Sequence, residues 1–135
     1  MIKNIQLTVN RQGLVEITAK INTIIQDSGI EEGLCTLFIK HTSCSLTIQE
    51  NADSSAQHDL ENWMNRLVSE DDPLYTHTFE GADDMPAHIK AALTATTLSI
   101  PFQDSQLCLG TWQGIFLWEH RHQPSTRTLV VHLSQ

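Results

Sequence analysis

The chain has 135 residues, of which 40% are hydrophobic, and its formal net charge is −8; this size and composition predict a single compact domain over residues 1–135. Its eight Lys and Arg residues are scattered, which argues against a nucleic-acid partner, because neutralising phosphates requires clustered cations. No apolar run reaches the roughly 20 residues of a membrane-spanning helix and the N-terminus lacks the apolar region of a secretory signal, so we expect a cytoplasmic protein with no membrane partner.

The first part of the chain predicts strands with one helix between them. Apolar and polar residues alternate over 5–9, a turn follows at 10–13, and 14–18 is extended again, which predicts a β-hairpin. Isoleucines at three- and four-residue spacing over 19–28 predict an amphipathic helix that ends before Gly29. Apolar and β-branched residues over 34–39 and 41–47 predict one or two buried strands.

The rest of the chain predicts two helices and then only strands. The longest helix is expected over 53–70, where Leu60, Trp63, Met64, Leu67 and Val68 form one stripe. A shorter helix is expected over 86–95, followed by strands near 98–100, 107–109, 115–118 and 129–133. Because short turns join most strands, we predict an α+β fold with a layered, mostly antiparallel sheet and two or three helices. Exposed edge strands would favour a symmetric oligomer.

An acidic segment at 80–90 combines three carboxylates, a histidine and a helix start. Glu80, Asp83 and Asp84 precede Pro86 and His88. Clustered carboxylates repel one another unless a cation or a hydrogen-bond donor offsets the repulsion, so this segment indicates a cation site or a proton-transfer site. The alternative is that Asp83 or Asp84 only caps the helix that Pro86 opens.

A second polar group lies at 41–45, with Asn51 a few residues later. If this segment is a regular strand, His41, Ser43 and Ser45 share one face, which predicts a surface for an anion or a substrate. The alternative is that His41 is a strand-end histidine and the hydroxyl groups bind the backbone. No GxSxG motif accompanies the serines, which disfavours a serine nucleophile.

The third group spans 110–121, where glycines and polar residues bracket an apolar strand. Glu119 at the end of that strand is a candidate to accept a proton or to orient a histidine, and Arg121 is a candidate phosphate ligand. Trp112 and Trp118 are expected to fill a core more often than to stack on a ligand.

A metal site would require several of these segments to converge. His41, His77 and His88 are the candidate metal ligands, together with a carboxylate. No HExxH motif is present, so the local signal is weak. The cysteines form no CxxC pair and are expected to be buried hydrophobic residues without a disulfide framework: Cys35, Cys44 and Cys108.

Taken in order, these motifs resemble the YjbQ family over nearly the whole chain. The matching motifs are His41-Thr42-Ser43, Glu50-Asn51, Asp59, the segment 80–90, the segment 110–114 and Glu119-His120-Arg121. The resemblance implies an α+β homotrimer, a pocket that lies at a subunit boundary, and a low thiamin phosphate synthase activity. That reaction joins hydroxymethylpyrimidine diphosphate to thiazole phosphate and releases diphosphate, with Mg²⁺ as the usual divalent ion.

The resemblance also implies roles for individual residues. Under this hypothesis the catalytic residues are His41, Asp83, His88 and Glu119, with either Asp83 or Asp84 joining Glu119 to hold the metal or the pyrimidine amine. The residues expected to bind substrate or phosphate are Thr42, Ser43, Asn51, Thr111, Gln113 and Arg121. The chain has neither a P-loop nor a basic cluster, so a side activity on a small phosphorylated heterocycle fits better than a primary one. Two alternatives stay open: a hydrolase that uses histidines and carboxylates to bind Zn²⁺ or another transition metal, and a noncatalytic module that binds a small anionic metabolite.

Overall fold

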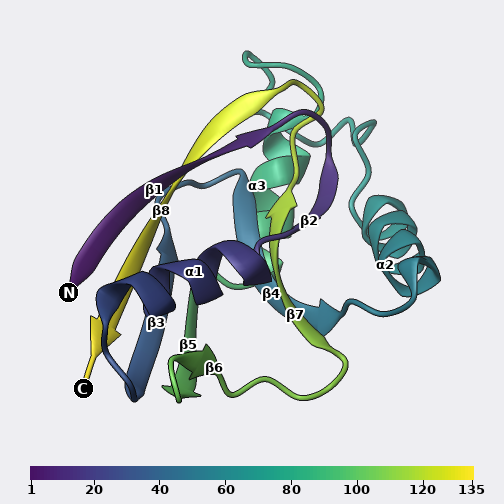
Figure 1. Cartoon of the computed structure of the whole chain (residues 1–135). Helices are drawn as coiled ribbons and strands as arrows, with labels where there is room; N and C mark the ends of the chain where they lie inside the picture. The colour runs from purple at the N-terminus through teal and green to yellow at the C-terminus, as the bar shows by residue number, and fades with distance from the viewer.

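Two antiparallel sheets and three helices make up the computed structural model, which describes residues 1–135 (Figure 1). The five-stranded sheet has the order β1-β8-β3-β5-β6, and the three-stranded sheet has the order β2-β7-β4. Every strand pair is antiparallel, so the predicted α+β class and antiparallel pairing are confirmed. The strand bounds are β1 Ile2–Val9, β2 Gly13–Glu16, β3 Gly33–Ile39, β4 Cys44–Glu50, β5 Thr97–Gln103, β6 Gln106–Leu107, β7 Gln113–Glu119 and β8 Ser125–Ser134.

The predicted N-terminal hairpin is wrong. β1 pairs with β8, from Ile2 opposite His132 to Val9 opposite Ser125, whereas β2 pairs with β7 in the other sheet. The turn between the two strands therefore carries the chain from one sheet to the next. Alternating hydrophobicity identifies a strand but not its partner, because the period of two is the same for a local and a distant pairing.

The main core is shared by both sheets and by helix α1, Thr18–Ser28. Ile21, Ile24 and Ile25 of α1 are buried, as their spacing predicted. Gly29 ends the helix with a φ of 73°, a left-handed conformation that glycine adopts without a Cβ penalty. These side chains pack in one cluster with residues of both sheets, such as Leu37 and Leu117.

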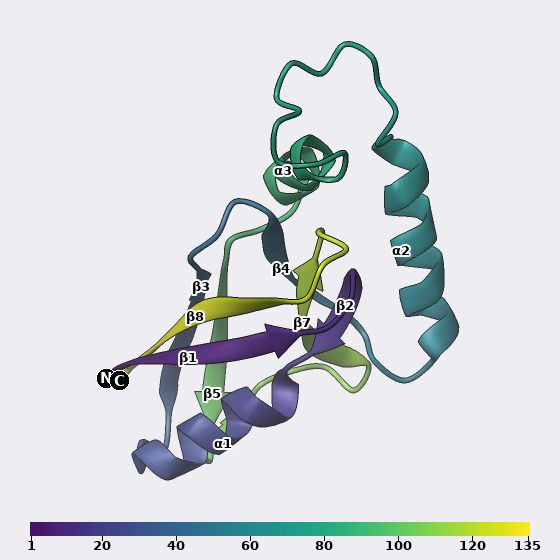
Figure 2. The same ribbon diagram turned by 90° about the horizontal axis from the view of Figure 1, so that it is seen from above.

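Helix α2, Ser54–Leu67, lies beside the three-stranded sheet (Figure 2), and Met64 packs there in a second cluster with Leu14, Phe116 and Trp118. It begins at Asp53, whose side chain accepts a hydrogen bond from the Ser55 amide at 2.9 Å, as expected for an N-cap. The predicted apolar stripe is only partly buried: Met64 is covered, whereas Trp63 and Leu67 are 53% and 54% exposed.

Helix α3, Asp84–Leu93, starts two residues before the predicted range. Asp83 occupies its N-cap position but makes no side-chain capping bond, so helix capping by Asp83 is excluded and its carboxylate has another role. None of the three helices is both long and apolar enough to cross a membrane.

The cysteine prediction is wrong at one position. Cys35 and Cys44 are buried in the main core, whereas Cys108 is exposed. Burial raises the pKa of the Cys35 thiol to about 11 and that of the Cys44 thiol to about 12, so both stay protonated as small apolar groups.

Candidate metal site and its surroundings

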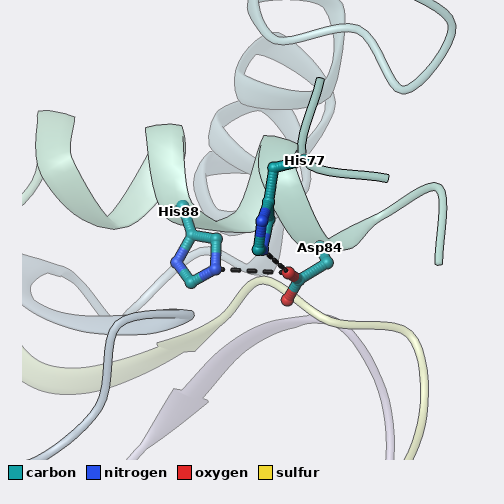
Figure 3. A group of neighbouring side chains, drawn as sticks. All are labelled: His77, Asp84 and His88. Atoms are coloured by element: carbon teal, nitrogen blue, oxygen red, sulfur yellow. Dashed lines mark hydrogen bonds and ion pairs between the residues drawn. The ribbon is translucent and has the colours of Figure 1, made fainter. Parts of the chain in front are cut away.

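Two histidines and one aspartate converge at the start of α3. Asp84 and His88 are four residues apart and share a helix face, and His77 comes from the loop between α2 and α3 (Figure 3). The Asp84 Oδ2 atom lies 2.8 Å from His77 Nε2 and 3.3 Å from His88 Nε2. The three possible ligand atoms lie within 4.8 Å of one another.

A neighbouring arginine holds the Asp84 carboxylate in place. Asp84 is 2% exposed, and its Oδ1 accepts a hydrogen bond from Arg121 Nη1 at 2.6 Å. Arg121 Nη2 donates to the Glu80 carbonyl at 2.9 Å. One carboxylate oxygen is therefore committed to the arginine, and the other faces the two imidazoles.

The backbone fixes the orientation of His88. His88 Nδ1 lies 2.9 Å from the Thr42 carbonyl oxygen. Because a carbonyl only accepts, Nδ1 carries the proton, and a neutral His88 presents the lone pair of Nε2 to the Asp84 carboxylate. Two acceptors at 3.3 Å repel each other unless a proton or a cation lies between them. A backbone carbonyl on the second ring nitrogen is also the usual support of a metal-ligating histidine.

Asp83, the predicted catalytic aspartate, does not face the histidines; Asp84 does. The Asp83 Oδ2 atom accepts a hydrogen bond from the His122 amide at 2.8 Å, and Oδ1 lies 3.2 Å from Arg121 Nε. This second contact has an ion-pair distance but poor hydrogen-bond alignment, since Arg121 Nε is the buried polar atom without a hydrogen-bond partner. Burial raises the pKa of Asp83, but the His122 amide and the Arg121 guanidinium outweigh burial and hold it below its usual range. Asp83 therefore stays ionised and positions Arg121.

His41 was predicted to bind a metal with His77 and His88, and the structure does not place it in that group. Its Nε2 accepts a hydrogen bond from the Thr128 amide at 2.8 Å. Burial and the nearby Arg127 lower the pKa of His41, so the ring is kept neutral and the lone pair of Nε2 is occupied by the backbone.

The predicted shared strand face of His41, Ser43 and Ser45 is also wrong, because β4 begins only at Cys44. Ser43 accepts hydrogen bonds from Arg127 Nη2 through its carbonyl at 3.3 Å and through its hydroxyl at 3.0 Å. Ser45 is fully buried, and its hydroxyl lies 2.9 Å from His120 Nε2.

Glu119 is an anchor within the fold and does not face the histidine group. Its fully buried carboxylate accepts from Arg127 Nε at 2.7 Å, from Ser125 Oγ at 2.7 Å and from the His120 and Arg121 amides at 3.0 and 3.2 Å. Burial raises the pKa of Glu119, but these donors, led by Arg127, outweigh burial and hold it below its usual range. A carboxylate with this many donors is a poor proton acceptor.

The other predicted binding residues lie at the far end of β4 and β7. Glu119 pairs with Cys44 at one end and Gln113 pairs with Glu50 at the other, a separation of about 20 Å along seven-residue strands. Asn51 Nδ2 donates to Glu16 Oε2 at 2.9 Å, and Gln113 Oε1 accepts from the Gly110 amide at 2.8 Å. Thr111 lies in the same turn as Gly110 and Gln113. Within one chain the predicted site residues therefore form two separate polar groups, one at each end of β4 and β7, and not one pocket.

Sequence reasoning did not single out Arg127. Its side chain is 8% exposed and pairs with Glu119. A signal was available: Arg127 falls at an inward-facing position of β8, in register with the buried Leu129, Val131 and Leu133. A charged residue at an inward position requires a buried partner of opposite charge.

Similarity to known proteins identifies the family. A family profile described as "UPF0047 protein YjbQ-like" matches residues 3–135. The chain belongs to this family. Among relatives, a UPF0047 protein of Synechocystis is 51% identical over 95% of this chain and 88% of its own length. The YjbQ protein of Escherichia coli O157:H7 is 39% identical over 97% of this chain and 95% of its own length.

Solved structures of YjbQ-like proteins share the fold. A conserved hypothetical protein from Thermus thermophilus matches with a TM-score of 0.88 at 34% identity, covering 98% of this chain and 99% of that one. A YjbQ/UPF0047 family protein from Clostridium acetobutylicum matches with a TM-score of 0.85 at 29% identity, covering 96% and 99%. None of these names states a reaction, so the chemistry must come from the site.

Proposed function

We propose that this YjbQ-family chain is a cytoplasmic enzyme that uses a divalent metal ion bound by His77, Asp84 and His88, and that it has low thiamin phosphate synthase activity. One observation carries the metal proposal: the protonated Nδ1 of His88 is held by the Thr42 carbonyl, which aims the second ring nitrogen at the Asp84 carboxylate. Two imidazoles and one carboxylate are a ligand set found in metal enzymes.

The surroundings of the site fit a modest synthase activity. A divalent ion would supply neutralisation of the negative charge that accumulates on departing diphosphate. The chain itself contributes Arg121, which fixes the Asp84 carboxylate through Oδ1. Arg121 and Arg127 are each paired with carboxylates, so little positive charge is left to hold a diphosphate group.

A second candidate function is a metal-dependent hydrolase. Imidazole ligands suit Zn²⁺ better than Mg²⁺, which prefers oxygen ligands. Catalytic zinc sites keep three protein ligands and an open position, and the chemistry that zinc supplies there is hydrolysis of esters or phosphates. The ligand types of His77, Asp84 and His88 therefore favour this candidate over a dedicated Mg²⁺ enzyme. A noncatalytic module for an anionic metabolite is the third candidate.

We also propose the homotrimer that the resemblance implies. Phe79 is 99% exposed two residues after His77, and Trp112 is 64% exposed between Thr111 and Gln113. Large exposed aromatic rings beside both polar groups support an assembly in which one subunit covers the other. Light scattering coupled to size exclusion tests this proposal, and a monomer at micromolar concentration would contradict it.

The experiment for the enzyme proposal measures thiamin phosphate formation from the pyrimidine diphosphate and the thiazole phosphate, with Mg²⁺, Mn²⁺ or Zn²⁺ added to metal-free protein. We expect product from the wild type, loss of product in Asp84→Asn and His88→Ala, and retention in His58→Ala, which alters an exposed histidine on α2. Absence of product from the wild type with every metal refutes the synthase proposal. Metal-dependent hydrolysis of p-nitrophenyl phosphate or acetate in the same preparations would then favour the hydrolase.

A further inference from the structure

A polar cavity adjoins the candidate metal site. It has a volume of about 180 Å³ and is lined by Ser43, Arg121, Gln123, Pro124, Ser125 and Arg127. Arg121 connects the two sites, since its Nη1 holds Asp84 at 2.6 Å while its side chain forms part of the cavity wall. Ser43 follows Thr42, whose carbonyl holds His88. None of the three candidate ligands lines the cavity, but a molecule there would be separated from Asp84 only by the Arg121 side chain.

The cavity wall offers an unused cationic donor. The Arg127 side chain is 8% exposed, and it donates through Nε and Nη2 to Glu119 and Ser43. Its Nη1 donates no hydrogen bond within the chain. Arg127 Nη1 is not among the buried atoms that lack a partner, so it remains accessible. Because Arg127 lines the cavity, the two N–H groups of Nη1 are the donors it has left for a molecule bound there.

Two further donors surround the same space. The Ser43 hydroxyl oxygen accepts from Arg127 Nη2, which leaves its own hydrogen free to donate. Gln123 lines the cavity on the turn before β8, and its amide can donate as well. No carboxylate lines the cavity, although Glu119, Asp83 and Asp84 lie behind the guanidinium groups. The wall therefore offers N–H and O–H donors and no carboxylate oxygen, while the carboxylates behind it balance the two guanidinium charges.

We propose that this cavity is an oxyanion subsite that holds a phosphate group of the substrate beside the metal ion. The proposal rests on the proposed function, because it supplies the substrate class for that site. Arginine binds carboxylates and phosphates alike through a two-pronged fork, and the Nε and Nη2 fork of Arg127 is already occupied by Glu119, so Arg127 offers an anion only single donors. Single donors from three different segments suit a tetrahedral oxyanion.

Nitrogen-detected NMR of the arginine side chains tests this proposal on the full-length protein. The chain has four arginines, Arg11, Arg66, Arg121 and Arg127. Metal-free protein is titrated with inorganic phosphate and, separately, with acetate at constant ionic strength. We expect a saturable shift of the Arg127 resonance with phosphate, a much smaller shift with acetate, and none at Arg11 or Arg66. An unmoved Arg127, or equal shifts at all four arginines, overturns the subsite.

The phosphate affinities of two variants make the test quantitative. Arg127→Lys keeps the charge but loses Nη1, and we expect phosphate affinity to fall roughly 10-fold or more, in line with one hydrogen bond to a charged group. Arg11→Lys, at a side chain that is 69% exposed, is the matched control and should leave the affinity unchanged. If Arg127→Lys does not fold, the titration of the wild type decides alone.

Zinc binding to the same preparations separates this proposal from the proposed function. Phosphate binding at Arg127 without zinc binding supports the subsite and contradicts the metal site. Zinc binding without a phosphate shift leaves the metal site standing and overturns the subsite.

Discussion

Replacing Glu119 by glutamine tests the strongest electrostatic contact in the fold. Glu119→Gln keeps the side-chain shape but removes the negative charge that is fully buried against Arg127. Breaking a buried pair leaves an uncompensated charge, which destabilises by about 3–5 kcal/mol. With an unfolding entropy of about 2.1 cal/mol/K per residue, this loss lowers Tm by roughly 10–18 °C.

Urea and thermal unfolding at fixed protein concentration measure the effect. The pKa of Glu119 is lower in the folded chain than the usual 4.5, so the stability it contributes is fully present above pH 4.5 and is lost as the pH falls through the folded pKa. The deficit of the variant should shrink accordingly in acid. Glu70→Gln is the control, because the Glu70–His122 pair lies at the surface, with side chains 35% and 55% exposed, and should contribute about 0–1 kcal/mol. A loss below about 1 kcal/mol in Glu119→Gln would refute the assignment of Glu119 as an anchor.

Two further predictions concern pH and packing. Burial, with Lys90 and Arg127 adding to it, lowers the pKa of His120 to about 3. Between pH 6.5 and pH 3 the unfolded chain therefore binds a proton that the folded chain does not. The free energy of unfolding should fall as the pH drops across this range, by up to about 1.4 kcal/mol per pH unit. His120→Gln should flatten this slope in urea titrations run across that range, and an unchanged slope would contradict a buried neutral His120. Gly33→Ala should cost at least about 1–3 kcal/mol, because an added Cβ would lie 1.9 Å from the Ser134 carbonyl oxygen; calorimetry showing an unchanged Tm would contradict this close contact.

Local signals were sufficient for the helices and for the fold class. The spacing of Ile21, Ile24 and Ile25 predicted the buried face of α1, and Gly29 marked its end through capping chemistry that involves only neighbouring residues. Strand pairing is different, because partners are chosen by burial across the whole chain. The alternation in β1 was therefore recognised, while its pairing with β8 was not.

The candidate site could be predicted only where its geometry depends on residues close together in the sequence. Helical phase distinguishes Asp84 from Asp83, because only Asp84 is four residues from His88; this distinction was available from the sequence. The position of His41 outside the group of three could not be predicted, because its ring accepts a hydrogen bond from the Thr128 amide, 87 positions away. The separation of Asn51 and Gln113 from the histidines likewise depends on the register of β4 and β7.

Calorimetric titration of zinc into the metal-free chain tests the central claim most directly. We predict one Zn²⁺ bound per chain, no stoichiometric binding in Asp84→Asn or His88→Ala, and unchanged binding in His41→Ala, whose ring lies outside the group of three. Circular dichroism of each variant confirms that it is folded. Failure of the wild type to bind zinc, Mn²⁺ or Ni²⁺, or equal binding by the wild type and the folded Asp84 and His88 variants, would contradict the assignment of His77, Asp84 and His88 as a metal site.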